Sequence, residues 1–309
     1  MFNVGQVLKH EDVSVPYTGN VAEEAVRFNW VKPFSTGQWI YLAPMARLIR
    51  ALHEALRRHI VPAVGYEEWI FPRLQHTASL ESFGWLAVPN LPLELFDVTP
   101  HRLEERPLEA RMLDPLQCTS FYHYFSQGKI SDDLLPLKIF EVLGGWTYRN
   151  EKPERFNHGF HTGLEFCGAE LVFLGSPAEV KDIRWQTLRH MTELLNRLGM
   201  NWRLVVGTSC CHKHSEKYSH YLDEAISIDE IPTIDIEGWI PATGEWLELG
   251  GGDIAHDRLV NGFGLQTESN ADIWSGCQGL GFGRMAYVFL SQFGFDTAQW
   301  PTTMSELLP

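Results

Sequence analysis

The sequence lacks the features of a membrane or secreted protein. None of its apolar runs approaches the roughly 18 residues that cross a bilayer. The first twenty residues have neither the basic stretch nor the apolar core of a signal peptide. The five cysteines are odd in number and scattered along 309 residues, which does not make a disulfide framework. We therefore predict a protein of the reducing cytoplasm with no membrane partner.

Positive charge is also scarce. The chain has 25 Lys and Arg against 39 Asp and Glu, a net charge of −14. Nucleic-acid binding draws much of its affinity from Lys and Arg that neutralise phosphates. A strongly acidic protein can still carry a local basic face, so the charge argues against tRNA binding without excluding it.

Hydrophobic patterning is present throughout, with neither internal repeats nor low-complexity linkers, and predicts one compact domain. Residues 37–60 have apolar side chains at helical spacing and predict an amphipathic helix. Residues 64–74, rich in aromatic and β-branched side chains, predict a strand. Ser176 and Pro177 mark a helix start, and Gly199 marks its end. Further strands are expected at 143–149, 164–174, 201–207, 233–240 and 245–249, followed by a glycine-rich turn and a helix at 282–293. Neighbours of the hairpin type favour an α+β fold, a mainly antiparallel sheet flanked by helices.

Four segments in order resemble the signature motifs of class II aminoacyl-tRNA synthetases. A helix leading into Gly65–Pro72 is similar to the first motif, Tyr148–Glu151 to the second and Gly281–Arg284 to the third. Residues 235–241, with Glu248 downstream, are similar to seryl-tRNA synthetases. The resemblance covers about residues 37–293. It implies a class II catalytic domain over 37–309, preceded by an extension at 1–36, and a homodimer formed through the first motif.

The chemistry of aminoacyl-adenylate formation explains these residue types. A carboxylate attacks the α-phosphorus of ATP, so fixed guanidiniums are needed where two anions meet. The resemblance implies that Arg149 clamps the α-phosphate and the substrate carboxylate, and that Arg284 holds the γ-phosphate. Arg155 would bind the β- and γ-phosphates, Glu151 would accept from the adenine amino group, and Glu248 would hold Mg²⁺. The alternative for each arginine is a surface ion pair.

Strand alternation arranges the segment 164–172. Side chains two and four positions apart share a face, so Phe166 lies on the same face as Glu170, and Glu165 lies on the other face with Cys167. In the synthetase family the corresponding phenylalanine stacks on adenine. The alternative for Phe166 is packing in the core.

Cysteine placement adds a metal hypothesis. If Glu170 projects into the pocket with Cys118 and Cys277, the three make the three-ligand set of a catalytic zinc site. Buried free cysteines are, by themselves, more often core residues. The stretch from Phe166 to Val180 resembles the amino acid:[carrier protein] ligases, small homologues of the atypical zinc-dependent seryl-tRNA synthetases. That resemblance implies zinc at these three positions, a small amino acid as substrate, and transfer to the phosphopantetheine thiol of an acidic carrier protein.

The segment from Cys210 to His214 stands outside that pattern, as does a longer loop in the second motif. Adjacent cysteines followed by histidines form either a rival metal site or a strand end that runs into a helix. The basic side chains here, with Lys213 and Lys217, are candidates for docking the carrier protein. A solvated helix explains them equally well.

The acceptor hypothesis rests on a missing part. Only 36 residues precede the first motif, too few for the long helical arm with which seryl-tRNA synthetases grip tRNA. We therefore expect no tRNA partner. The alternatives are an adenylate-forming enzyme with another acceptor (a tRNA, an amine or a protein lysine) and a non-catalytic paralogue that binds an amino acid. The intact phosphate-binding motifs argue against the paralogue.

Overall fold

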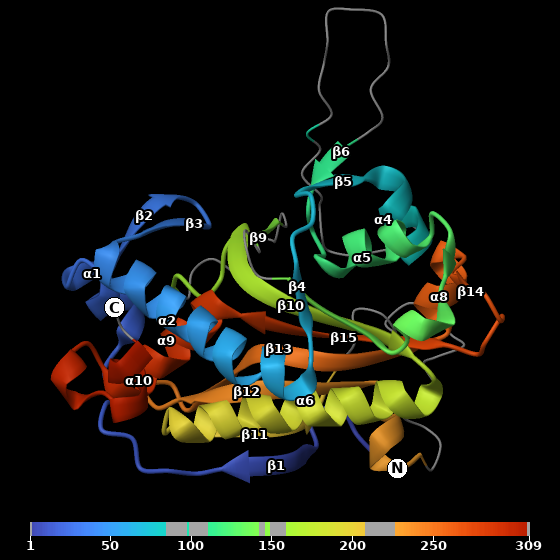
Figure 1. The fold of residues 1–309 in the computed structure, drawn as a ribbon. Coiled ribbons are helices and arrows are strands. Elements are labelled where there is room, and N and C mark those ends of the chain that lie inside the picture. Colours follow the sequence, from blue (N-terminus) through green and yellow to red (C-terminus); the bar gives the residue numbers. More distant parts are fainter. Residues whose placement is uncertain are drawn as a thin grey trace, which may run out of the picture.

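The protein is built on one large, mainly antiparallel sheet (Figure 1). The computed structural model describes residues 2–84, 98, 111–141, 146–148, 159–207 and 226–307. Within these residues the sheet has nine strands in the order β1-β11-β12-β13-β15-β10-β8-β4, and β9 also pairs with β10. Every pairing in it is antiparallel except that of β4 with β8. The α+β class, with a mainly antiparallel sheet flanked by helices, is confirmed.

The strands are β1 (Val7–Glu11), β2 (Val31–Ser35), β3 (Gln38–Tyr41), β4 (Glu67–Trp69), β5 (Leu74–His76), β6 (Arg111–Leu113), β7 (Lys129–Ile130), β8 (Leu137–Glu141), β9 (Trp146–Tyr148), β10 (Glu165–Gly175), β11 (Trp202–Val206), β12 (Thr233–Ile240), β13 (Glu245–His256), β14 (Gln266–Thr267) and β15 (Trp274–Gly281). The helices are α1 (Val21–Arg27), α2 (Ala43–His59), α3 (Val61–Val64), α4 (Thr77–Phe83), α5 (Cys118–Phe125), α6 (Pro177–Arg197), α8 (Arg258–Phe263), α9 (Phe282–Phe293) and α10 (Thr302–Leu307).

Helices α2, α6 and α9 cover one face of the sheet and enclose the main core (Figure 1). The apolar stripe of α2, including Met45, Leu48 and Leu52, is fully buried there, whereas Arg47 and Arg50 are exposed. Helices α4, α5 and α8 form a second core cluster with side chains of β8, β10 and β15. Together the two clusters cover both faces of the sheet over much of its length.

Two local expectations are wrong. Residues 38–41 do not begin a helix: they form β3, which pairs with β2, and the helix begins at Ala43 with Pro44 in its first turn. Trp, Ile and Tyr favour an extended strand at this position. Gly250, Gly251 and Gly252 are not a turn either, since they lie in the middle of β13.

The N-terminal 36 residues are integrated into this fold. Strand β1 pairs with β11 at one edge of the main sheet. Side chains of α1 and β2, such as Val21, Ala25 and Val31, lie in the main core. The division at residue 37 stays a prediction. None of the helices in the described residues is both long and apolar enough to cross a membrane.

Candidate active site

A pocket opens on the sheet face that lies toward α5. Strands β10, β12, β13 and β15 form its floor, and the start of α5 forms one wall. Six of the site residues predicted from the sequence line this pocket: Cys118, Phe166, Glu170, Glu248, Cys277 and Arg284. The fold thus brings together six residues that are spread over 167 positions of the sequence.

Several glycines of β13 and β15 lie in the floor of the pocket. Gly250 and Gly251 of β13 lie opposite Leu280 and Gly279 of β15. A Cβ on Gly250 would come within 2.0 Å of the Gly279 carbonyl oxygen, and a Cβ on Gly279 would come within 3.1 Å of Glu170 Oε2. Glycine within a strand marks a place where another backbone or a ligand approaches closely. The absence of side chains at these glycines therefore lets the strands lie close together and keeps the pocket deep.

Cys118, Glu170 and Cys277 converge on one point of this pocket. Their ligand atoms all lie within 4.8 Å of one another, and both thiols are buried. Cys118 is the first residue of α5, Glu170 lies on β10, and Cys277 lies on β15, where its Cα partner is Val172 of β10. In the part of the chain that the structure describes, this is the one group of His, Cys, Asp or Glu with such a geometry.

The three side chains would carry three negative charges close together if all of them were deprotonated. Burial raises the pKa of Glu170 to about 8, although a hydrogen bond with Cys277 acts in the opposite direction. The carboxylates of Asp253, Asp114 and Glu141 raise it further. Two thiols and a carboxylate with one open position match the ligands that zinc takes in catalytic sites. The donor set therefore fits a zinc ion.

The described ATP-site candidates lie at the other end of the pocket. Phe166 is partly buried and also borders a smaller adjoining pocket, which shares Gly281 and Arg284 with the first. Arg284, in the first turn of α9, lies 3.4 Å from the Glu248 carboxylate and donates a hydrogen bond to the Glu248 carbonyl at 3.2 Å. Both side chains of this ion pair are well exposed, so the pair is weak and open to exchange.

Several predicted site residues lie outside the described residues. These are Arg149, Glu151 and Arg155 of the second motif, the docking candidates Lys213 and Lys217, and the segment from Cys210 to His214. Their roles stay predictions.

Other pocket residues had no place in the sequence prediction. Asp253 is buried, lies opposite Cys277, and accepts a hydrogen bond from Thr233. Gln117, next to Cys118, also lines the pocket. Asp253 directly follows the three glycines of β13, and the strand continues through them. Because these glycines were predicted to form a turn, the sequence did not indicate that Asp253 lies in the pocket.

The fold and this pocket together define a synthetase catalytic domain, and comparison with known families agrees. Residues 96–293 match the family described as tRNA synthetase class II core domain (G, H, P, S and T). The chain belongs to this class II tRNA synthetase core domain family.

Within that family the chain is close to type-2 serine–tRNA ligases. It is 29% identical to the enzyme of Methanothermobacter thermautotrophicus over 94% of this chain and 60% of that one. It is 28% identical to the enzyme of Methanopyrus kandleri, with the same coverage of each. A crystal structure of M. kandleri SerRS in complex with A. aeolicus tRNASec superposes with a TM-score of 0.87 at 25% identity, covering 100% of this chain and 65% of that chain. The chain thus spans about three-fifths of the length of these relatives.

These comparisons overturn two expectations about the acceptor. A carrier-protein thiol as acceptor is wrong, because the similar proteins are named as serine–tRNA ligases. The exclusion of tRNA is wrong as well, because a close structural neighbour is in complex with a tRNA. The net charge misled because it sums the whole chain and says nothing of a local surface. The small number of residues ahead of the first motif was an equally poor basis for excluding a tRNA partner.

Proposed function

We propose that this chain is the catalytic part of a zinc-dependent serine–tRNA ligase, which forms seryl-adenylate from serine and ATP and passes the seryl group to tRNA. The observation that carries this is the convergence of Cys118, Glu170 and Cys277 in the pocket of a chain similar to type-2 serine–tRNA ligases over nearly its whole length. The similarity supports serine as the amino acid and tRNA as the acceptor.

Zinc would be held by the two thiolates and the Glu170 carboxylate. When bound, it supplies a Lewis-acidic position that binds a deprotonated α-amino group and so selects a free amino acid. The glycine floor leaves space for a small side chain beside this position. Asp253 and Thr233 supply polar groups at the same end of the pocket.

ATP would occupy the end of the pocket that includes Phe166 and Arg284. Phe166 would stack on the adenine ring, with Gly281 and Gly283 leaving room across from it. The Arg284–Glu248 pair would separate as the nucleotide binds. Arg284 would then pair with the γ-phosphate, and Glu248 would bind the Mg²⁺ of Mg·ATP. Because both side chains are exposed, breaking their ion pair costs little.

The second motif would complete the reaction centre. Arg149 directly follows Tyr148, the last residue of β9, and β9 pairs with β10 beside Phe166. Its guanidinium would bind the α-phosphate and the serine carboxylate together, which brings the attacking oxygen to phosphorus. Glu151 and Arg155 would bind the adenine amino group and the outer phosphates.

Serine transfer to RNA tests this function. The protein would be incubated with ATP, Mg²⁺, zinc, labelled serine and unfractionated tRNA, and acid-precipitable label would be counted. We expect label in RNA that is released by mild base, as an ester is, and none with periodate-oxidised tRNA. Serine-dependent consumption of ATP without label in RNA would contradict tRNA as the acceptor.

A further inference from the structure

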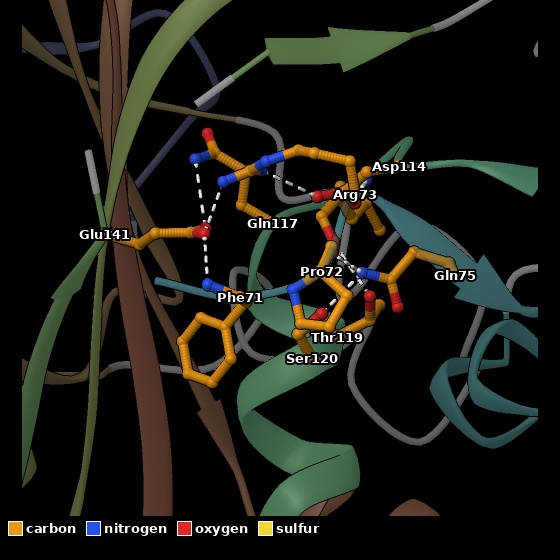
Figure 2. A network of polar contacts seen from close by, with 10 residues as sticks. Phe71, Pro72, Arg73, Gln75, Asp114, Gln117, Thr119, Ser120 and Glu141 are labelled. Carbon is orange, nitrogen blue, oxygen red and sulfur yellow. Dashed lines mark hydrogen bonds and ion pairs between the residues drawn. The ribbon is translucent and has the colours of Figure 1, made fainter. Parts of the chain in front are cut away.

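A network of polar side chains connects the end of the first motif to Gln117 (Figure 2). Gln117 directly precedes Cys118, and both line the pocket. At the centre of the network is Arg73, which follows Pro72 in the loop between β4 and β5. Its guanidinium forms ion pairs with Asp114, at 3.1 Å, and with Glu141. Asp114 and Glu141 are almost fully buried, at 1% and 2% exposure. One cation therefore bridges two enclosed carboxylates from separate parts of the chain.

Each carboxylate in turn holds the segment that enters α5. Asp114 accepts a hydrogen bond from the backbone N–H of Leu116 at 3.1 Å. Glu141 accepts one from the Gln117 side-chain amide at 3.3 Å and another from the Phe71 N–H at 2.9 Å. Helix α5 has no side-chain cap hydrogen bond, and Gln117, at its N-cap position, donates to Glu141. The start of α5 is thus fixed from outside the helix.

The same network touches the other parts of the site through the sheet. Glu141 of β8 lies directly opposite Glu170 of β10, so the ladder sets their spacing. The Asp114 carbonyl accepts a hydrogen bond from the N–H of Tyr148, the residue before Arg149. The Arg73 carbonyl accepts from the Asp114 N–H at 3.0 Å, which makes the bridge rigid.

We propose that Arg73 is a positioning residue, which holds Cys118 at the proper distance from Glu170 through Asp114, Glu141 and Gln117. This rests on the function proposed above, in which Cys118 and Glu170 share a zinc ion. Only the planar guanidinium, with donors pointing in two directions, reaches both carboxylates at once. Without it, the start of α5 keeps its contacts with the second core cluster, but Asp114 and Glu141 lose the cation that joins them, and the Gln117–Glu141 hydrogen bond has to hold the start of α5 to β8 without that support.

Cysteine reactivity tests the proposal in metal-free protein, independently of any activity. The alkylation rate of Cys118 by iodoacetamide would be measured by peptide mass spectrometry, with Cys167 as an internal reference. Arg73→Lys keeps the charge and removes the bridge. Gln117→Met removes only the last link and leaves the buried ion pairs in place. We expect the ratio of the Cys118 rate to the Cys167 rate to rise at least about tenfold in both variants.

Arg258→Lys is the matched control, because Arg258 is also partly buried and donates to a backbone carbonyl, that of Phe83, in the same half of the molecule. It should leave the ratio as in the wild type. A wild-type ratio in both Arg73→Lys and Gln117→Met would overturn the proposal. A parallel rise at Cys118 and Cys167 would overturn it too, since that reports general loosening.

A zinc titration then links the network to the metal. Competition with a chelating dye should show zinc binding weakened about tenfold or more in Arg73→Lys and unchanged in Arg258→Lys. Equal zinc affinity in the wild type and Arg73→Lys would also overturn the positioning role. A wild-type protein that binds no zinc would instead contradict the proposed metal site, while the cysteine ratio would still decide the role of Arg73.

Discussion

At the scale of single residues, the site brings together two thiols and a carboxyl group, an arrangement that a bound cation would explain. Cys118 and Cys277 are buried at 2% and 7% exposure, and the pKa of Glu170 is raised by burial. A buried carboxyl group favours its neutral form unless a positive charge compensates it. The proposed zinc ion would supply that charge and use all three groups.

Replacement of one thiol should remove the metal. Zinc content of purified Cys118→Ser, measured by inductively coupled plasma mass spectrometry, should fall from about one ion per chain to below about a tenth, since a hydroxyl is a poor zinc ligand beside one remaining thiolate. Cys167→Ser is the matched control, because Cys167 lies on β10 three residues before Glu170 and outside the ligand group. A Cys118→Ser protein that retains full zinc would contradict the proposed ligand set.

Phe166 should contribute to ATP affinity alone. Loss of base–aromatic stacking weakens binding by roughly 1–3 kcal/mol. Phe166→Ala should therefore raise the KM for ATP by about fivefold to 150-fold, with the KM for serine and the zinc content little changed. Phe166→Tyr keeps a ring and should stay near the wild type. Equal ATP KM values for Phe166→Ala and the wild type would leave Phe166 as a packing residue.

At the scale of elements, local chemistry predicted what is decided locally. The helix beginning at Ser176 has its capping box: Ser176 Oγ accepts from the Glu179 N–H, and Glu179 Oε2 accepts from the Ser176 N–H at 2.8 Å. Alternation along 164–172 placed Phe166 and Glu170 on one face, and both line the pocket. Each of these signals lies within a few residues of the feature that it predicts.

Features decided by distant contacts were missed. Gly250–Gly252 read as a turn because glycine favours turns in isolation, yet neighbouring strands on both sides keep the segment extended. Residues 38–41 read as helix because the apolar spacing continued, yet pairing with β2 makes them a strand. The Arg73 network includes hydrogen bonds between positions up to 70 residues apart, and no spacing in the sequence indicates it.

The capping box gives a test at this scale. Ser176→Ala should lower the free energy of unfolding by about 1 kcal/mol, the usual contribution of an N-cap side chain. Urea unfolding followed by circular dichroism would measure it. Ser227→Ala is the control, because Ser227 precedes a 3₁₀ turn without a side-chain cap bond and should cost only a few tenths of a kcal/mol. Equal losses in the two variants would show that the box adds nothing to α6.

At the scale of the whole molecule, the edge strand β4 offers a surface for a second copy. Among the described residues it is the last strand of the main sheet, next to β8, and Ile70, directly after it, is 65% exposed. We expect the homodimer that the first motif implies to form here, since an edge strand followed by an exposed apolar side chain is a ready pairing surface. Ile70→Arg should shift the sedimentation coefficient from dimer to monomer, whereas Ile228→Arg, at another exposed isoleucine, should not. A monomeric wild type at micromolar concentration would contradict this.

The central claim, that this domain activates serine with ATP at a zinc site, is tested most directly by ATP–pyrophosphate exchange. The exchange rate would be measured with each of the twenty amino acids, before and after zinc is removed with a chelator and restored. We predict exchange with serine well above that with the other amino acids, its loss on zinc removal and its return when zinc is added. Exchange with no amino acid, or serine-dependent exchange that is indifferent to zinc, would contradict the account.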